Sequence, residues 1–316
     1  MSQVQTERGL SISAHSPLVS VIIPNFNYSQ FLKTAIESVL SQTYVNFELI
    51  VVDDGSTDDS LQVIRGYGNK LKLLTQKNSG VASARNLGIE SARGKFICFL
   101  DSDDTWDPRK LQLQVDFLMN SEAGLVYSSI LVCDGQLESS SLLAAMYRGD
   151  CRHYFYKFPG RSIVLLGCSS AMLRKEVIDS IGQFDTSLST AADWDFFRRA
   201  ANHCSFDYIN LPLVKYRKHT SNMSSQSLRE YYSDNEIAVR RLISDSEHKS
   251  LIVISRLLST WIRFQTGAAS AHFRNKQWGL GLRRLLRSLV FVSLSVSILL
   301  NRTQATDSTI NISTEN

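Results

Sequence analysis

The sequence predicts an α/β fold in which a mixed, mostly parallel sheet is flanked by helices. Apolar, β-branched runs alternate with amphipathic stretches through the first 120 residues, with short loops between them. Such alternation is typical of βαβ units, whose strands are parallel and whose helices cover both faces of the sheet. Hydrophobic residues make up 43% of the 316 residues and charged residues 20%, which is the balance of a chain with a real core.

Four strands are expected in this first part. The first is a continuous apolar, β-branched run, as expected of a strand that is buried on both faces, and the second is expected to be buried as well. The four strands are Val19–Pro24 (VSVIIP), Phe47–Val52 (FELIVV), Leu71–Thr75 and Lys95–Leu100 (KFICFL).

Four helices are expected between and after these strands. Ser56 and Asp59 match a capping box, which predicts that a helix begins at Ser56. Pro108 is a residue type favoured in the first turn of a helix. The helices are expected over Tyr28–Gln42, from Ser56 to about Gly66, over Gly80–Ala92, and from Pro108 to about Asn120.

The pattern is less regular after residue 120. Strands are expected over Ala123–Cys133, Ile163–Leu173 and Phe206–Tyr216, and helices over Lys175–Ile181 and Thr190–Asn202. The stretch Asp134–Asp150 is interpreted as a variable insertion or loop. From Leu228 onward the sequence is mostly helical in character.

The charge of the chain argues against a nucleic-acid partner. Its net charge is +4 and its pI about 8.7, whereas nucleic-acid binders have clustered basic residues and usually a higher pI. The basic excess lies in Gln226–Asn316, which holds 12 Lys and Arg against 7 Asp and Glu. This part could meet anionic lipid or a phosphorylated acceptor, or it could be a solvated helix face.

Cysteine usage and the N-terminus favour a cytoplasmic protein. The five cysteines are widely spaced without a C-x-x-C pair, which excludes a disulfide framework and a zinc knuckle. Residues 1–16 are polar and contain no apolar signal-peptide core. The uncharged segment Ser288–Leu300 is 13 residues long, too short to cross a bilayer, and could lie in the membrane interface or be buried.

In a parallel sheet, ligands bind at the carboxyl ends of the strands. Four loops are expected at that edge: Asn25–Tyr28, Asp53–Thr57, Gln76–Gly80 and Asp101–Asp107. The sequence contains no G-x-G-x-x-G after the first strand and no G-x-x-x-x-G-K-[ST], G-x-S-x-G or H-E-x-x-H. This argues against a dinucleotide-binding fold, a P-loop NTPase, an α/β-hydrolase and a zincin.

The densest acidic cluster is Asp101-Ser102-Asp103-Asp104. Carboxylates this close repel one another unless a cation lies between them, and hard oxygen ligands favour Mg²⁺ or Mn²⁺. If the loop is extended, Asp101 and Asp103 point to the same side. An acidic turn in which Asp104 caps the next helix would explain the cluster equally well.

Two other loops carry candidate binding residues. Asp53 and Asp54 precede Gly55, and one of them could accept a hydrogen bond from a base or sugar, although a Gly turn and a helix cap explain part of the pattern. Phe26 lies in the polar loop Pro24–Asn27. It could stack on a planar base, or it could staple the following helix.

The chain resembles the family 2 glycosyltransferases, which have the GT-A fold. The matching segments are VSVIIPNFN (19–27), SVLSQTYVNFELIVVDDGSTD (38–58), NSGVASARNLGI (78–89) and GKFICFLDSDDTWDP (94–108). A weaker match continues through GCSSAMLRKEVIDSIGQFD (167–185), DWDFFRR (193–199) and YRKHTSNMS (216–224). The resemblance covers about two thirds of the chain, and the order and spacing of the segments are those of the family.

The resemblance implies a nucleotide site in the first half of the chain. Phe26 would stack on the base, and Asp54, with Asp53 beside it, would hydrogen-bond it. Arg85 would contact the base or a phosphate. The implied nucleotide-binding residues are Pro24, Phe26, Asn27, Asp54, Arg85 and Asp101.

The resemblance also implies metal-binding and catalytic residues. Asp101 and Asp103 would form the D-x-D pair, with Asp103 on Mn²⁺ or Mg²⁺ and the diphosphate, and Asp104 is a further candidate. Asp193 falls where the family has its catalytic base, with Asp195 as a second candidate. His219 lies in a segment that in relatives closes over the diphosphate.

One position departs from the family pattern. Relatives usually have Glu-Asp where this chain has Ala192-Asp193, so the acid is present and its neighbour is missing. This departure bears on the acceptor contacts and on the pKa of Asp193.

The implied reaction is an inverting, metal-dependent transfer of a sugar from a nucleotide sugar, UDP- or dTDP-hexose, to a hydroxyl of a glycan or lipid-linked acceptor. The setting would be cell-surface polysaccharide assembly, with the protein in the cytoplasm or peripheral on the inner face of the membrane. A nucleotidyltransferase and a non-catalytic nucleotide-sugar binder are the alternatives.

The expected domains follow from the same resemblance. Residues 17–225 would form the glycosyltransferase domain, with a nucleotide-binding half over about 17–120 and an acceptor half over about 121–225. The remaining parts would be a flexible N-terminus (1–16), a mostly helical extension (226–302) and a disordered tail (303–316).

Overall fold

The computed structural model describes residues 16–157, 164 and 167–222. It also describes seven single residues further along: Asp234, Ile237, Arg241, Ala269, Trp278, Gly279 and Leu282. Residues 1–15, the segment 288–300 and the tail 303–316 lie outside the described residues, as does nearly all of the helical extension expected over 226–302.

The chain divides into two compact units, and each is described by itself. The first contains Met1–Cys151, Ser162–Thr186 and Phe196–His219. The second contains Arg152–Arg161, Ser187–Asp195 and Thr220–Asn316.

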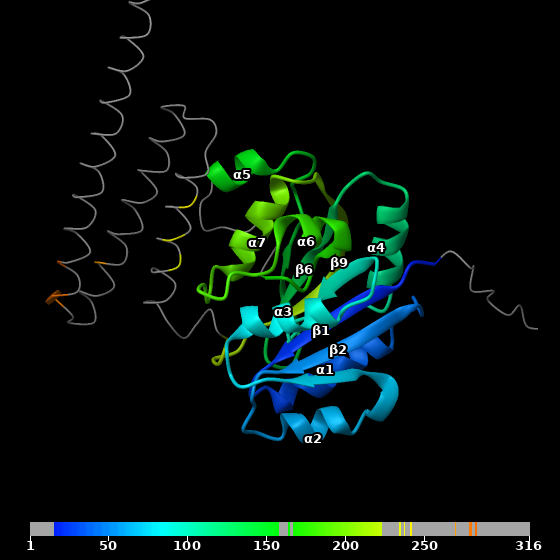
Figure 1. Ribbon diagram of the computed structural model, residues 1–316, viewed down its shortest axis with the longest axis vertical. Coiled ribbons are helices and arrows are strands. Elements are labelled where there is room, and N and C mark those ends of the chain that lie inside the picture. Colours follow the sequence, from blue (N-terminus) through cyan, green and yellow to red (C-terminus); the bar gives the residue numbers. More distant parts are fainter. Residues whose placement is uncertain are drawn as a thin grey trace, which may run out of the picture. The chain divides into compact units, whose positions relative to one another are not determined.

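The first unit is built on one sheet, to which nine strands of the described residues contribute (Figure 1). The strands are β1 Val19–Asn25, β2 Phe47–Asp53, β3 Lys72–Thr75, β4 Phe96–Phe99, β5 Thr105–Trp106, β6 Leu125–Cys133, β7 Ser139–Leu143, β8 Met172–Arg174 and β9 Phe206–Arg217. Their order is β3-β2-β1-β4-β8-β6-β9-β5, and β7 pairs with β6.

One half of the sheet is parallel. β1 lies between β2 and β4, β3 follows β2, and all three pairings are parallel. β1 and β2 stay in register from Val19 opposite Phe47 to Asn25 opposite Asp53, so both strands end at the same edge. The β-α-β-α-β-α-β order predicted from the sequence is confirmed.

The other half mixes directions. β8 runs antiparallel to β4 and β6, while β9 is parallel to β6 and antiparallel to β5. Trp106 of β5 lies opposite Val214 of β9. Because β9 ends at Arg217, the residues that follow it emerge close to the loop between β4 and β5.

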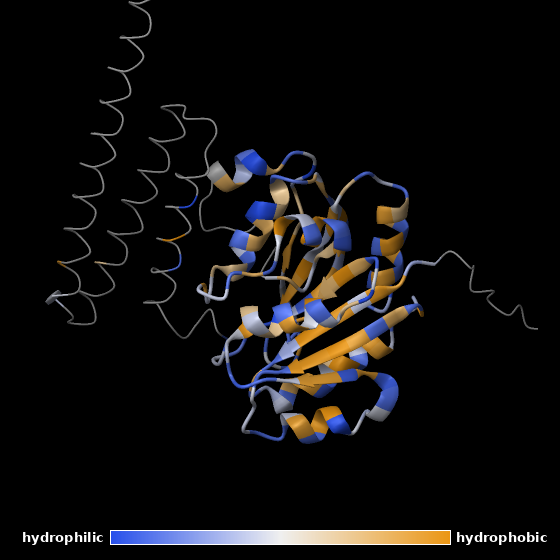
Figure 2. Ribbon diagram, viewed as in Figure 1, coloured by the Kyte–Doolittle hydropathy of each residue, from blue (hydrophilic) through white to orange (hydrophobic). Residues whose placement is uncertain are grey.

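Helices of the first unit cover both faces of this sheet. They are α1 Ser29–Leu40, α2 Ser60–Arg65, α3 Val81–Ser91, α4 Lys110–Met119 and α6 Lys175–Ile181, with a 3₁₀ turn at Gly68–Lys70. The second unit contains α5 Arg152–Lys157 and the first turn of α7 Ala192–Ala201. Side chains alternate along β1: Val21 packs in one core cluster with Ile36 of α1, and Ile22 contacts Gly88 of α3. Figure 2 shows hydrophobic residues gathered along the central strands.

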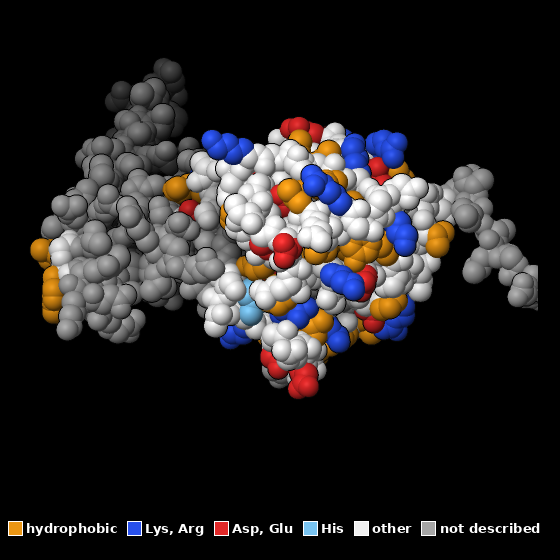
Figure 3. Space-filling view, turned by 90° about the horizontal axis from the view of Figure 1, so that it is seen from below, with side chains coloured by type: hydrophobic (Ala, Val, Ile, Leu, Met, Phe, Trp, Pro, Cys, Tyr) orange, Lys and Arg blue, Asp and Glu red, His pale blue; other side chains and the backbone are white. Residues whose placement is uncertain are grey.

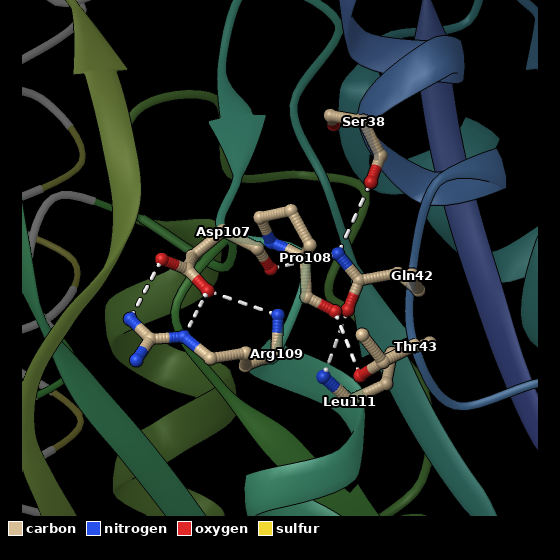
Figure 4. Close-up of polar contacts among 7 residues, drawn as sticks. All are labelled: Ser38, Gln42, Thr43, Asp107, Pro108, Arg109 and Leu111. Carbon is tan, nitrogen blue, oxygen red and sulfur yellow. Dashed lines mark hydrogen bonds and ion pairs between the residues drawn. The ribbon is translucent and has the colours of Figure 1, made fainter.

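The end of α1 is tied to the start of α4 by Gln42 (Figure 4). Its Nε2 donates to the carbonyls of Ser38 (3.1 Å) and Asp107 (2.8 Å), and its Oε1 accepts from the amide of Leu111 at 2.9 Å. The amide of Thr43 donates to the carbonyl of Pro108 at 2.8 Å. Gln42 is 6% exposed, and both polar atoms of its side-chain amide have hydrogen-bond partners. This buried amide therefore fixes the position of the chain just after β5.

Two local expectations are wrong. Ser56 does not cap a helix, because α2 begins at Ser60 and the Ser56 hydroxyl accepts hydrogen bonds from Asn25 and Asn27 instead. The strand expected over Ile163–Leu173 is shorter and later: β8 covers only Met172–Arg174, and the described residues Cys168–Ala171 form a turn.

The expected loop Asp134–Asp150 contains structure. It holds β7, which forms an antiparallel hairpin with β6. The amide of Ala145 is also bonded to the Ser129 hydroxyl at 3.0 Å. β7 was not predicted because three of its five residues are serines, which are not typical of strands.

The described surface is mixed in charge. On the face in Figure 3, Lys and Arg side chains are spread singly among acidic, apolar and uncharged ones. In the described part of the chain, no helix has both the length and the apolar character needed to span a membrane.

Candidate active site

The loops after β1 and β2 are locked together. Asp53 Oδ2 accepts from Asn25 Nδ2 at 3.0 Å, and its Oδ1 accepts from the amide of Ser56 at 2.9 Å. Asn27 has a left-handed φ of 57°, and its Oδ1 accepts from the amide of Thr57 at 2.7 Å. Asp53 and Asn27 therefore shape the edge that was predicted to bind nucleotide.

Asp54 fixes the neighbouring loop before α3. Its carboxylate accepts from the amides of Ser79 and Gly80, both at 2.8 Å, and from Gln76 Nε2 at 2.7 Å. Asp54 is 3% exposed. A carboxylate has about four acceptor positions, so this one keeps about one for a ligand.

Gly55 is required between these loops. Its φ is +78°, and a Cβ there would lie 2.9 Å from the backbone nitrogen of Asn78. Phe26 follows buried Pro24 and Asn25 at the end of β1 and is 39% exposed, so part of its ring is accessible at this edge of the sheet.

The acidic cluster after β4 is a turn and not an extended loop. The amide of Asp104 donates to the carbonyl of Asp101 at 3.0 Å. Arg85 Nη2 lies 2.6 Å from Asp101 Oδ1, which joins α3 to this turn. The sequence-predicted residues Arg85 and Asp101 are thus direct partners.

Asp103 pairs with His219. His219 Nε2 lies 3.0 Å from Asp103 Oδ2, and both side chains are nearly buried, at 9% and 11% exposure. Burial and the charge of Asp101 raise the pKa of Asp103, although the hydrogen bond with His219 works against this rise. The His219 ring packs on Phe31 at a centroid distance of 4.6 Å.

Asp104 is a structural residue of the turn. It is 1% exposed, and it accepts from the Ser169 hydroxyl (2.7 Å) and the Arg217 amide (3.1 Å) instead of capping the next helix. Burial, with Asp103 and Asp101 nearby, raises the pKa of Asp104 well above its ordinary value.

Sequence reasoning missed two residues of this cluster. The side chain of Arg217 donates to the carbonyls of Asp103 (2.9 Å) and Gly135 (2.6 Å), and its guanidinium lies 4.7 Å from the centre of the Phe31 ring. Its place two residues before His219 was the available signal. Ser169, which binds Asp104, lies in a run without chemical pattern.

The second unit holds the predicted base. Asp193 is half-buried in the first turn of α7, and its Oδ1 accepts from the amide of Trp194 at 2.7 Å. Asp195 is 2% exposed and lies 3.2 Å from Arg241 Nη1. Ala192, at the position where a Glu is usual, is buried. The two carboxylates therefore differ in burial: Asp193 is half-buried at the start of α7, whereas Asp195 is buried beside Arg241.

These features agree with the comparisons. The family model described as glycosyl transferase family 2 matches residues 20–182, and the chain belongs to this family. An uncharacterised glycosyltransferase of Rickettsia prowazekii is 34% identical over 227 residues, which cover 69% of this chain and 70% of that protein. The protein is thus a glycosyltransferase, as the sequence predicted.

Two further likenesses are more limited. WfgD of Escherichia coli, named as a UDP-Glc:alpha-D-GlcNAc-diphosphoundecaprenol beta-1,3-glucosyltransferase, is 40% identical over 114 residues, or 35% of this chain and 45% of that protein. TarS of S. aureus, solved with UDP-GlcNAc, superposes with a TM-score of 0.65 at 19% identity, over 85% of this chain and 81% of that one. The second likeness confirms the GT-A fold.

Proposed function

We propose that this protein is a metal-dependent, inverting glycosyltransferase with a UDP- or dTDP-linked hexose as donor. The observation that carries the proposal is the cluster after β4, where Arg85 and His219 each hold one carboxylate of the D-x-D pair Asp101 and Asp103. Strands β1 and β2 end at the same edge of the sheet, and Phe26 is exposed in the loop that follows β1. The nucleotide would lie along this edge.

The chemistry of the cluster fits a bound Mn²⁺ or Mg²⁺. Burial and the charge of Asp101 raise the pKa of Asp103, and burial with Asp103 and Asp101 nearby raises the pKa of Asp104, so a bound cation would favour the ionised forms of both carboxylates. Within the described ranges, no group of three or more His, Cys, Asp or Glu side chains could hold a metal ion by itself. Mg²⁺ is usually held by one or two carboxylates together with substrate phosphates and water, and Asp103 would supply such a carboxylate. When bound, the ion would stabilise the charge that develops on the leaving diphosphate.

Asp193 would act as the base. A sugar hydroxyl is a weak nucleophile, and a carboxylate within hydrogen-bond reach takes its proton as the hydroxyl attacks. The N-terminal turn of α7 favours a negatively charged side chain at Asp193. Asp195 is less suited, because it is buried and paired with Arg241. A single displacement by the activated hydroxyl inverts the anomeric carbon.

The donor and acceptor classes rest on relatives. The TarS structures contain UDP-GlcNAc or UDP, and WfgD is named for UDP-Glc as donor and a lipid diphosphate as acceptor. By analogy, this chain would transfer a hexose to a glycan or lipid-linked hydroxyl in cell-surface polysaccharide assembly. Such an acceptor would be met at the cytoplasmic face of the membrane.

Peripheral membrane contact is part of the same proposal. Trp278 and Leu282 are 68% and 57% exposed, and the sequence beside them carries Arg283, Arg284 and Arg287. Exposed aromatic and aliphatic side chains next to arginines suit an anionic membrane interface. Cosedimentation with vesicles containing phosphatidylglycerol, compared with phosphatidylcholine alone, tests this contact; protein that stays in the supernatant with both contradicts it.

A donor screen tests the proposed function. Purified protein is incubated with Mn²⁺ or Mg²⁺ and a panel of nucleotide sugars, and nucleoside diphosphate release is followed with and without EDTA. We expect release from one donor that EDTA abolishes. Release that survives EDTA contradicts metal dependence, and pyrophosphate release from a nucleoside triphosphate indicates a nucleotidyltransferase. Nucleotide binding without transfer or donor hydrolysis indicates a binding protein.

A further inference from the structure

The second unit contains a buried carboxylate that the proposed reaction does not use. Oδ2 of Asp234 accepts hydrogen bonds from three consecutive backbone amides, those of Ser189 (2.8 Å), Thr190 (2.6 Å) and Ala191 (3.1 Å). It also accepts from the Thr190 hydroxyl at 3.2 Å. Asp234 is 5% exposed, so this carboxylate is buried on the segment that leads into α7.

This contact sets the start of α7. The amide of Asp195 donates to the carbonyl of Ala191 at 3.0 Å, which makes Ala191 the residue where the hydrogen bonding of the helix begins. The amide of Ala191 has no partner within the helix, the amides of Ser189 and Thr190 lie just before it, and a carboxylate there also meets the positive end of the helix dipole. By binding these amides, Asp234 fixes the backbone two residues before Asp193.

A second residue from the same part of the chain contacts the other carboxylate of α7. Arg241 Nη1 lies 3.2 Å from Asp195 Oδ1, and Asp195 is 2% exposed. A buried carboxylate is costly without a cationic or hydrogen-bonded partner. Asp234 and Arg241 are both helical and lie beyond residue 182, where the family match ends.

We propose that Asp234 and Arg241 are positioning residues through which the C-terminal part of the chain holds Asp193 in its reactive place. Asp234 anchors the backbone that enters α7, and Arg241 anchors the first turn of α7 through Asp195. This inference rests on the proposed function, because it takes Asp193 as the base. It assigns a positioning role to two residues that lie beyond residue 182, where the family match ends.

The test compares Asp234→Ala, Asp234→Asn, Arg241→Ala and Arg241→Lys with the wild type. The amide oxygen of Asn can still accept from the backbone, and Lys keeps the positive charge, so each conservative variant serves as a rescue. Asp179→Asn and Lys33→Ala are matched controls, since both remove a charge from an exposed surface pair. Hydrogen exchange of the peptide covering residues 187–195 is measured beside donor KM, kcat and UDP affinity.

We expect Asp234→Ala and Arg241→Ala to lower kcat by roughly ten- to a hundredfold, because a small displacement of a reacting group costs that much. UDP affinity and donor KM stay near wild type, exchange at residues 187–195 becomes faster, and the two conservative variants recover part of kcat. A merely structural role would instead lower stability without a selective loss of kcat.

Two results overturn the proposal in different ways. If the wild type transfers sugar and both alanine variants keep its kcat, the positioning role is wrong and the proposed function stands. If the wild type binds UDP but transfers no sugar to any acceptor, the proposed function fails, and the positioning role fails with it.

Discussion

His219 Nε2 lies 3.0 Å from Oδ2 of Asp103, although 116 residues separate the two in the chain. The contact exists because β9 returns to pair with β5, so that the segment after the last strand meets the turn after β4. The same return brings Arg217 onto the carbonyl of Asp103 at 2.9 Å. Burial, Asp103 and Asp101 all raise the pKa of Tyr28 beside this pair, so its phenol stays neutral.

Asp103→Ala should abolish the metal-dependent part of turnover. The variant loses the carboxylate proposed to hold the cation on the diphosphate, and removing one preorganised electrostatic group from a reacting centre costs on the order of a hundred- to a thousandfold in kcat. Initial rates against Mn²⁺ concentration measure the effect. Asp179→Asn, a change in an exposed pair on α6, is the control. Full turnover in Asp103→Ala would exclude this residue as the metal ligand.

Substitutions of the two acidic residues of α7, Asp193 and Asp195, should have different effects on kcat. Asp193→Asn removes the proposed base and should lower kcat by roughly a hundred- to ten-thousandfold, while UDP affinity is unchanged. Asp195→Asn leaves the base in place but weakens the pair with Arg241, so it should lower kcat by roughly tenfold, less than Asp193→Asn, and also lower thermal stability. Transfer assays and calorimetry on both variants distinguish the roles. If Asp195→Asn shows the larger loss of kcat, the assignment of the base is reversed.

The parallel half of the fold could be predicted because its signals are local. Unbroken apolar runs such as Val19–Pro24 mark strands buried on both faces, and Lys175–Ile181 was predicted with its observed bounds. The prediction of local structure failed where contacts with distant parts of the chain determine that structure. Ser56 has the chemistry of a helix cap, yet it is used by Asn25 and Asn27 from the neighbouring loop.

The site was predictable in part for the same reason. Asp101 and Asp103 could be identified because they lie in a cluster of acidic residues, and Arg85 because it lies in the motif NSGVASARNLGI. Their hydrogen-bond partners come from distant parts of the chain and do not lie in a sequence pattern that would identify them. Ser169 and Arg217 meet Asp104 only through the mixed half of the sheet, and Asp234 meets the start of α7 from 43 or more residues away.

Phe26→Ala should weaken nucleotide binding. The side chain is 39% exposed at the end of β1, and stacking of a base on an aromatic ring is worth about 1–3 kcal/mol, or roughly 5- to 160-fold in Kd. Titration calorimetry with UDP measures the change, and Phe26→Tyr should restore affinity. Leu142→Ala, which removes an exposed apolar side chain on β7, is the control. Equal UDP affinity in Phe26→Ala and wild type would mean that the ring does not contact the base.

Gly88→Ala should destabilise the first unit. A Cβ at Gly88 would lie 2.4 Å from Cγ2 of Ile22, a buried side chain of β1, so α3 could not keep its close approach to the sheet. Overpacking of this kind typically costs about 1–3 kcal/mol in the free energy of unfolding. Gly135→Ala is a matched control, because a Cβ there meets nothing within 4 Å. Urea denaturation compares the two, and equal midpoints would contradict the close packing of α3 on β1.

Lys110 should make the stability of the protein rise with pH. It is fully buried in α4, with Nζ 2.7 Å from Gln114 Oε1 and 3.8 Å from the centre of the Trp106 ring. Burial lowers its pKa from 10.5 to about 8. Below about pH 8 the lysine is charged in both the folded and unfolded states, and the fold bears the cost of burying that charge. Between about 8 and 10.5 the unfolded chain binds a proton that the folded protein does not, so the free energy of unfolding increases with pH, by about 3 kcal/mol in all.

Lys110→Met should remove this dependence. Urea denaturation at about pH 7 and about pH 10 gives the free energy of unfolding of wild type and variant at each pH. The change between the two pH values should be smaller in the variant. Both proteins carry Cys98→Ala, because burial raises the pKa of that thiol to about 11 while Lys110 lowers it, so its titration would differ between them. Lys33→Met, at an exposed position of α1, should keep the wild-type pH dependence. If Lys110→Met keeps it too, the lysine is charged in the folded protein throughout this range, and its contacts with Trp106 and Gln114 stabilise the ammonium enough to offset its burial.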